Sequence, residues 1–126
     1  MKEEYVTYPQ AVKLKELGFK DKCNAYYWTE DKAFECTNSI LHKNSDTCRT
    51  VVMAPFLWQA QKWLREKKKW HIVIEPRIWE QQVYDFKLWH YHRGYENANR
   101  GLDYISYELA LSAGIDAALK LLTDTE

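Results

Sequence analysis

Two histidines, His90 and His92, are the residues whose type and spacing first suggest chemistry. They stand two positions apart in an alternating run, so on a β-strand both imidazoles would project from one face. Two such rings can chelate a metal ion, but a metal site needs a third and a fourth ligand. Cys36, His42 or His71 would have to supply these from elsewhere in the chain. The simpler interpretation is that both histidines end a strand with satisfied hydrogen bonds, so we expect no metal and no cofactor.

The sequence shows neither an activated nucleophile nor a loop that binds phosphate. It has no Gly-x-Ser-x-Gly motif, and its 4 glycines are not clustered as a phosphate-binding loop requires. Cys48 lies beside Arg49, a cation that would favour the thiolate, but a partly buried, unreactive cysteine explains the same pair. The acidic residues have no spacing that pairs two carboxylates for acid–base catalysis. We therefore expect a protein that is not an enzyme, with a metal-dependent enzyme at His90 and His92 as an alternative.

Length and composition indicate one small domain that spans residues 1–126. With 46% hydrophobic and 15% aromatic residues, and 18 basic against 18 acidic side chains, the chain can bury enough surface to fold. The first nine residues are charged and polar, unlike a secretory signal, and no apolar run is long enough to span a membrane. The three cysteines, Cys23, Cys36 and Cys48, match neither a disulfide framework nor a zinc knuckle. These features predict a cytoplasmic protein without a membrane partner.

The first expected element is a helix that begins at Thr7 and ends at Gly18. Thr7 and Gln10 have the spacing of a capping box, and a proline at position 9 is tolerated in a first helical turn. Phe19, just past the glycine, is placed to make the hydrophobic contact of a C-terminal cap.

A hairpin is expected next, with strands over residues 24–29 and 33–37 separated by a polar turn. The composition of residues 38–50 is that of a loop. A second helix should start near Pro55, a residue suited to a first helical turn. Its buried face is predicted to contain Phe56, Ala60, Trp63 and Leu64.

The second half of the chain predicts another hairpin and a long final helix. Residues 70–75 and 84–88 alternate as strands do, and residues 94–101 read as a connection. The last helix should run from a Ser106 cap to about Leu122. Gly114 lies in the middle of its apolar face, where the missing side chain would let one backbone approach another. The face is predicted to contain Tyr107, Ala110, Leu111, Gly114, Ile115, Ala118, Leu121 and Leu122.

The element order, α-β-β-α-β-β-α, predicts an α+β fold in two layers. We expect one antiparallel sheet of four strands with the helices on one face, because consecutive hairpins commonly join one sheet and helices cover its apolar side.

Four segments resemble a family of small uncharacterised proteins encoded by phages and prophage-like mobile elements of gut anaerobes. They are KLKELGF at residues 13–19, MAP at 53–55, QKWLREK at 61–67 and ALSAGID at 110–116. The resemblance implies a phage context and touches the three expected helices. It carries no assigned activity and no catalytic residues.

Several aromatic side chains of the predicted strands lie on the face that does not form the core. Tyr26 and Trp28 alternate with Ala25 and Tyr27, and Trp89, Tyr91 and Arg93 face away from the apolar positions of their strand. An open aromatic face can stack bases of single-stranded nucleic acid, or it can be buried by a protein partner or a second copy. Alternatively, the rings pair across strands under a loop such as residues 38–50. We favour protein contact over nucleic acid because the net charge is zero.

A second candidate surface is a basic stripe on the second expected helix. Trp58, Lys62, Arg65 and Lys69 recur at steps of four, three and four residues. This stripe could follow a phosphate backbone, or Trp58 could pack on the sheet edge under the lysine stems. We therefore expect a non-enzymatic accessory protein that binds a protein partner or forms a homodimer, with single-stranded nucleic-acid binding as the alternative.

Overall fold

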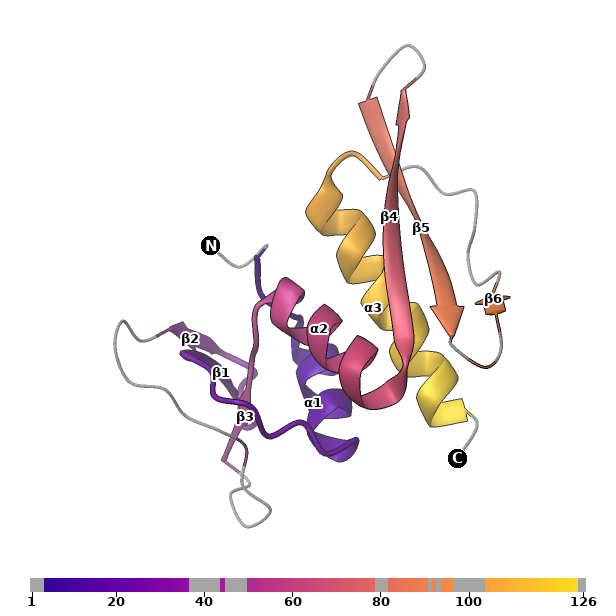
Figure 1. Ribbon diagram of the computed structural model, residues 1–126. Helices are drawn as coiled ribbons and strands as arrows, with labels where there is room; N and C mark the ends of the chain where they lie inside the picture. The colour runs from indigo at the N-terminus through magenta and orange to yellow at the C-terminus, as the bar shows by residue number, and fades with distance from the viewer. Residues whose placement is uncertain are drawn as a thin grey trace. The chain divides into compact units, whose positions relative to one another are not determined.

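The computed structural model describes residues 4–36, 44, 50–78, 82–90, 92, 94–96 and 104–124 (Figure 1). Its elements follow the order α1-β1-β2-β3-α2-β4-β5-β6-α3, and the architecture is α+β. The chain divides into two compact units, Met1–Phe56 and Leu57–Glu126, and each is described by itself.

The first unit begins with α1 (Tyr8–Glu16), whose start was correctly predicted. The Thr7 hydroxyl accepts a hydrogen bond from the Gln10 backbone N–H at 3.3 Å, and the Gln10 side chain accepts one from the Thr7 N–H at 2.8 Å. This reciprocal capping box satisfies two N–H groups that have no partner inside the helix.

The end of α1 is also as predicted. Gly18 adopts a φ of 99°, a left-handed conformation that favours glycine. The Phe19 N–H then donates to the Leu14 carbonyl at 2.9 Å, and the Gly18 N–H donates to the Lys15 carbonyl at 3.1 Å. Because these two bonds turn the chain back, the Phe19 side chain is fully buried.

The sheet of the first unit contains β1 (Ala25–Trp28), β2 (Phe34–Cys36) and β3 (Val51–Met53) in the antiparallel order β2-β1-β3. The predicted β1–β2 hairpin is confirmed, with Tyr26 opposite Glu35. The sequence did not predict β3, which pairs with the other side of β1 and places Met53 opposite Tyr26. Three residues are too short to show the alternation that identifies a strand.

One face of this sheet forms the core of the first unit. The Tyr27 hydroxyl donates to the Val6 carbonyl at 2.7 Å, so its buried polar atom is satisfied. The Tyr5 ring lies against Phe34 and stacks on Phe56, with centroids 5.1 and 4.4 Å away. Helix α1 packs against β3.

The second unit contains α2 (Leu57–Lys68), β4 (Trp70–Ile78), β5 (Gln82–His90), β6 (Gly94–Glu96) and α3 (Tyr107–Asp124). Its sheet has the antiparallel order β4-β5-β6. The predicted hairpin of β4 and β5 is confirmed, but the prediction of one four-stranded sheet is wrong. Each hairpin instead gains a third short strand from its own unit, β3 or β6 (Figure 1).

Strand β4 continues through Pro76 to Ile78, whereas the sequence predicts a strand over residues 70–75 only. Pro76 lies opposite Tyr84 in the ladder. The Tyr84 N–H and carbonyl are turned toward Tyr104 on the other side, with two bonds of 2.8 Å. Because this position makes no bond to β4, a proline that lacks an N–H removes nothing from the ladder.

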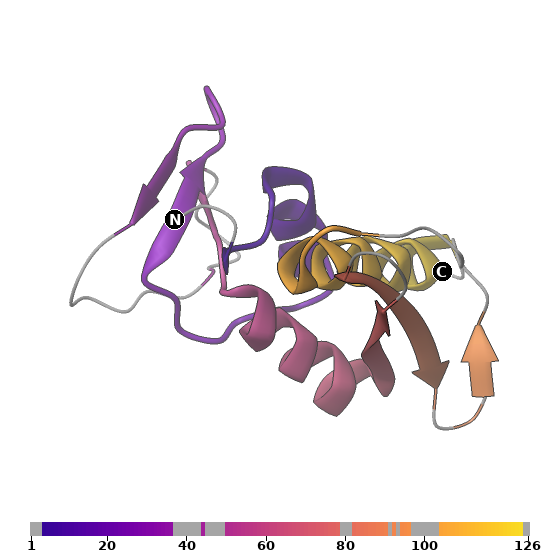
Figure 2. The same cartoon turned by 90° about the horizontal axis from the view of Figure 1, so that it is seen from above.

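Helix α3 lies along one face of the β4–β5 hairpin (Figure 2). The predicted cap is confirmed, since the Ser106 hydroxyl accepts from the Leu109 N–H at 3.1 Å. At Gly114 the neighbours are side chains and not a second backbone: a methyl group there would lie 2.5 Å from Ile72 Cγ2 and 3.5 Å from the Phe86 ring. Tyr107 was predicted on the buried face and is 44% exposed.

Candidate functional site

The β2-β1-β3 sheet has one covered face and one open aromatic face. Ala25 and Tyr27 are buried in the core, whereas Tyr26 is half-buried and Trp28 is 38% exposed. This alternation confirms the predicted orientation of β1. Its origin is the two-residue period of a strand, which sends successive side chains to opposite faces.

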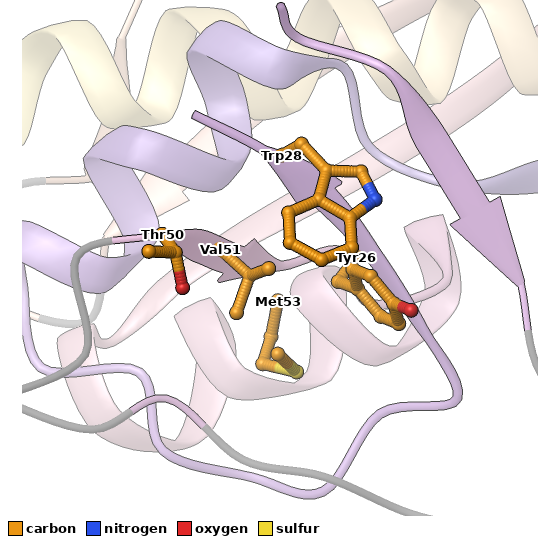
Figure 3. Close-up of a pocket in the computed structure, with 5 residues that line it drawn as sticks. All are labelled: Tyr26, Trp28, Thr50, Val51 and Met53. Carbon is orange, nitrogen blue, oxygen red and sulfur yellow. The ribbon is translucent and has the colours of Figure 1, made fainter. Parts of the chain in front are cut away.

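The open face holds a shallow hollow of about 190 Å³. The rings of Tyr26 and Trp28 rise from β1, and side chains from β3 and the residue before it complete the lining (Figure 3). The register explains the grouping, because Met53 lies opposite Tyr26 and Val51 lies opposite Trp28. We call this site the aromatic hollow; its residues are Tyr26, Trp28, Thr50, Val51 and Met53.

The two rings of the aromatic hollow contact each other directly. The planes of Tyr26 and Trp28 are inclined at 77°, and their centroids lie 5.7 Å apart. This edge-to-face arrangement is favourable for aromatic rings and contributes about 0.5–1.5 kcal/mol beyond the area buried. The rings are therefore held in place before a ligand arrives.

A carboxylate lies on the same face, across the β1–β2 ladder. The Tyr26 hydroxyl donates to Glu35 Oε2 at 2.8 Å, and the two residues are direct cross-strand partners. Because the carboxylate accepts this proton and repels the phenolate, the pKa of Tyr26 is raised above its ordinary value. Among the described residues, the open face thus places a negative charge, that of Glu35, beside flat apolar rings.

The aromatic residues predicted on the later strand belong to the other sheet. Trp89 is half-buried and lies edge-on to His71, its partner across the β4–β5 ladder, with centroids 5.1 Å apart. Lys87 on the same face forms an ion pair of 3.0 Å with Glu75. The expectation that Trp89 shares a sheet with Tyr26 and Trp28 is therefore wrong. The candidates Tyr91 and Arg93 lie outside the described residues.

The basic stripe is only partly continuous. Trp58 is 59% exposed on α2, and Lys62 and Arg65 are exposed along the same helix. Lys69 lies beyond the end of the helix with a φ of 65°, and its Nζ donates to the Glu66 carbonyl at 3.2 Å. The α2 stripe therefore consists of Trp58, Lys62 and Arg65, and Lys69 caps the C-terminal end of the helix.

The two histidines lie close together at the end of β5. The His92 backbone N–H donates to His90 Nδ1 at 3.1 Å, which occupies one imidazole lone pair, and the His90 ring lies 4.8 Å from that of Trp70. In the part of the chain that the structure describes, three or more His, Cys, Asp or Glu side chains nowhere gather as a metal site would require. His42, named above as a possible ligand, lies outside that part.

Sequence reasoning found the two rings of the aromatic hollow and missed the residues that complete it. Thr50 was placed in the loop of residues 38–50, Val51 and Met53 were assigned to no element, and Glu35 was not connected with Tyr26. The usable signal was the β-branched pair at positions 51 and 52, a composition that favours strands. Register cannot be read from one strand alone, so the proximity of Glu35 had no sequence signal.

None of the described helices has the length and apolar character needed to cross a membrane. No protein-family model matches the chain, and neither the curated proteins nor the solved structures yielded a match.

Proposed function

We propose that this chain is a non-enzymatic accessory protein that docks a side chain of a protein partner in the aromatic hollow. The observation that carries the proposal is the pair of half-buried Tyr26 and exposed Trp28, held edge to face beside a preformed hollow. The sequence resemblance adds that the protein is of phage or mobile-element origin. The cysteine usage supports a cytoplasmic location, since Cys23 and Cys36 are free thiols.

The size of the hollow supports a protein partner. Its volume of about 190 Å³ is several times the ~30 Å³ that one water molecule occupies in the liquid. It is smaller than the ~300–1,000 Å³ of a typical small-molecule site. A hollow between these limits suits one side chain of a larger partner, whose other contacts lie on the surrounding surface.

The charge of the open face favours a protein over nucleic acid. Surfaces that stack single-stranded bases combine aromatic rings with a positive groove that follows the phosphates. Here the Tyr26 hydroxyl donates its hydrogen bond to an acidic side chain, Glu35. A carboxylate at this position would repel phosphate and tolerate a neutral or basic protein surface.

The experiment is native mass spectrometry of the protein purified from the cells that naturally produce it, with Trp28→Ala and Trp58→Ala compared. Both are exposed tryptophans, so the second variant controls for loss of an indole. We expect a complex of defined mass, with a second copy or another protein, that Trp28→Ala weakens and Trp58→Ala leaves intact. Equal retention in both variants, with both folded by circular dichroism, would contradict docking at the hollow.

A second candidate function, single-stranded nucleic-acid binding, is favoured by one observation on α2. Trp58 is 59% exposed, with Lys62 and Arg65 exposed along the same helix, so a base could stack while the cations contact phosphate. Anisotropy of a labelled oligonucleotide should then fall steeply with salt and with Lys62→Ala or Arg65→Ala. Binding that is insensitive to salt would exclude this function.

A further inference from the structure

Two other aromatic rings of the molecule are already paired with lysine cations of the chain. Lys32 Nζ lies 5.4 Å from the centroid of the Tyr8 ring, and Lys68 Nζ lies 5.7 Å from that of Trp63. Both distances fall within the range in which a cation is attracted to the negative face of a ring. These contacts show that the protein uses cation–π pairs both at the half-buried Tyr8 ring and at the buried Trp63 ring.

Trp28 differs from these rings. Lys32 belongs to the turn between β1 and β2, yet its ammonium lies over Tyr8, beside the covered face of the sheet where Tyr8 contacts Tyr27. For Trp28 the structure records no cation of the described chain over the indole. Tryptophan binds cations more strongly than the other aromatic side chains. The Trp28 indole on the open face can therefore accept a cation that a partner supplies.

Glu35 supplies the matching negative charge. Its carboxylate accepts the Tyr26 hydroxyl proton at 2.8 Å, and no ion pair to Glu35 is recorded within the described residues. The hydrogen bond holds the carboxylate beside the rings while leaving it capacity to accept more, since an ionised carboxylate has about four lone-pair sites. The Glu35 carboxylate beside the Tyr26 and Trp28 rings is an arrangement that attracts an ammonium or a guanidinium group.

We infer that the aromatic hollow is selective for a basic side chain, a lysine or arginine that the partner presents on an extended peptide segment. The apolar stem of that side chain would lie in the hollow between Trp28 and Met53, and its cationic head would reach Glu35. This inference rests on the proposed docking function and adds the chemistry of the docked group. An acidic or purely apolar segment would lose the interaction with Glu35.

The experiment is NMR titration of ¹⁵N-labelled protein, observed at the Trp28 indole N–H, which a Trp28→Phe variant assigns. The probes are N-acetyl-lysine amide, N-acetyl-arginine amide and the neutral analogue N-acetyl-norleucine amide. We expect the lysine and arginine probes to shift the Trp28 signal with a Kd at least about three-fold lower than that of norleucine, as an exposed cation–π contact with a nearby carboxylate predicts.

Glu35→Gln is the matched variant, because the amide oxygen can still accept the Tyr26 proton while the charge is removed. It should abolish the difference between the lysine and norleucine probes. Glu30→Gln, which removes an exposed acid from the neighbouring turn, should preserve it. This control distinguishes the effect of losing the Glu35 carboxylate from the effect of a general change in net charge.

Two results would overturn the inference. Equal shifts with all three probes would show an apolar hollow without charge selectivity, and the absence of any shift would show that the hollow does not take a basic side chain. Neither result bears on the complex that we expect native mass spectrometry to detect. If that complex still depends on Trp28, docking stands and the selectivity for a basic group fails alone.

Discussion

Asn44 accepts a hydrogen bond of 3.0 Å from the backbone N–H of Met53 and thereby holds the strand that forms one side of the aromatic hollow. Its amide nitrogen donates to the Phe19 carbonyl, also at 3.0 Å. The residue is only 6% exposed, so removing the amide would deprive the buried Met53 N–H of the hydrogen bond that Asn44 accepts from it. A single buried side chain therefore links the end of α1 to β3.

We predict that Asn44→Ala lowers the free energy of unfolding by about 1–3 kcal/mol, because it removes two buried hydrogen bonds, including the one that the Met53 N–H donates. Urea unfolding followed by circular dichroism measures the change. Asn24→Ala is the control, since Asn24 is half-buried and accepts a longer bond of 3.3 Å from Tyr5. A cost for Asn44→Ala no greater than that of the control would show that Asn44 does not hold β3.

Gly114→Ala should destabilise the second unit by about 1–3 kcal/mol, the usual cost of overpacking. The added methyl would lie 2.5 Å from Ile72 Cγ2, so helix and hairpin would have to move apart. A double-mutant cycle with Ile72→Ala tests the cause, because removing the Ile72 side chain should relieve much of the penalty. If the stability losses of Gly114→Ala and Ile72→Ala simply add in the double variant, the strain does not come from the contact between the added methyl and Ile72.

The cysteines should differ in their reaction with iodoacetamide. Burial, with a smaller contribution from Asp21, raises the pKa of Cys23 to about 12, so this thiol stays protonated and shielded at pH 8. Cys36 is exposed. We expect peptide mapping after brief labelling at pH 8 to find Cys36 modified and Cys23 unmodified, with Cys23 reacting only in denaturant. Rapid labelling of Cys23 in the folded protein would contradict its burial.

Stability should fall as the pH rises from about 10 to 12. Burial, together with the contact to Cys36, raises the pKa of Tyr5 to about 12, whereas an unfolded tyrosine ionises near 10. Between these values the folded state binds the proton more tightly, so its stabilisation is complete below pH 10 and is lost as the pH rises. Tyr5→Phe should flatten this decline in urea unfolding midpoints, measured relative to pH 8. If the midpoint falls with pH as steeply in Tyr5→Phe as in the original protein, Tyr5 is not the cause of the decline.

The helix termini could be predicted because their signals are local. Thr7 with Gln10, and Gly18 with Phe19, are separated by few residues, and their backbone bonds form within one turn. The orientation of β1 was equally accessible, since alternation along one strand decides which side chains share a face. These short-range rules apply whatever the rest of the chain does.

The sheets and the completed site required information that a single sequence does not carry. Strand β3 joins β1 across a long separation, and the choice of partner depends on packing and register. The same limitation hid Glu35, which reaches Tyr26 only through the register of the β1–β2 ladder. At Gly114 the need for space was correctly inferred, but the occupants, Ile72 and Phe86, follow from how α3 lies on the hairpin.

The most direct test of docking at the aromatic hollow is a photo-crosslinking amino acid placed at position 50, at the edge of the hollow, and, separately, at position 58 of the full chain. Both positions are exposed, so both probes sample the surroundings of the protein while Tyr26 and Trp28 stay in place. We predict a crosslinked species of one defined mass from position 50, which Trp28→Ala diminishes, and no such species from position 58. Defined adducts from position 58 alone, or identical adducts from both positions, would contradict the account.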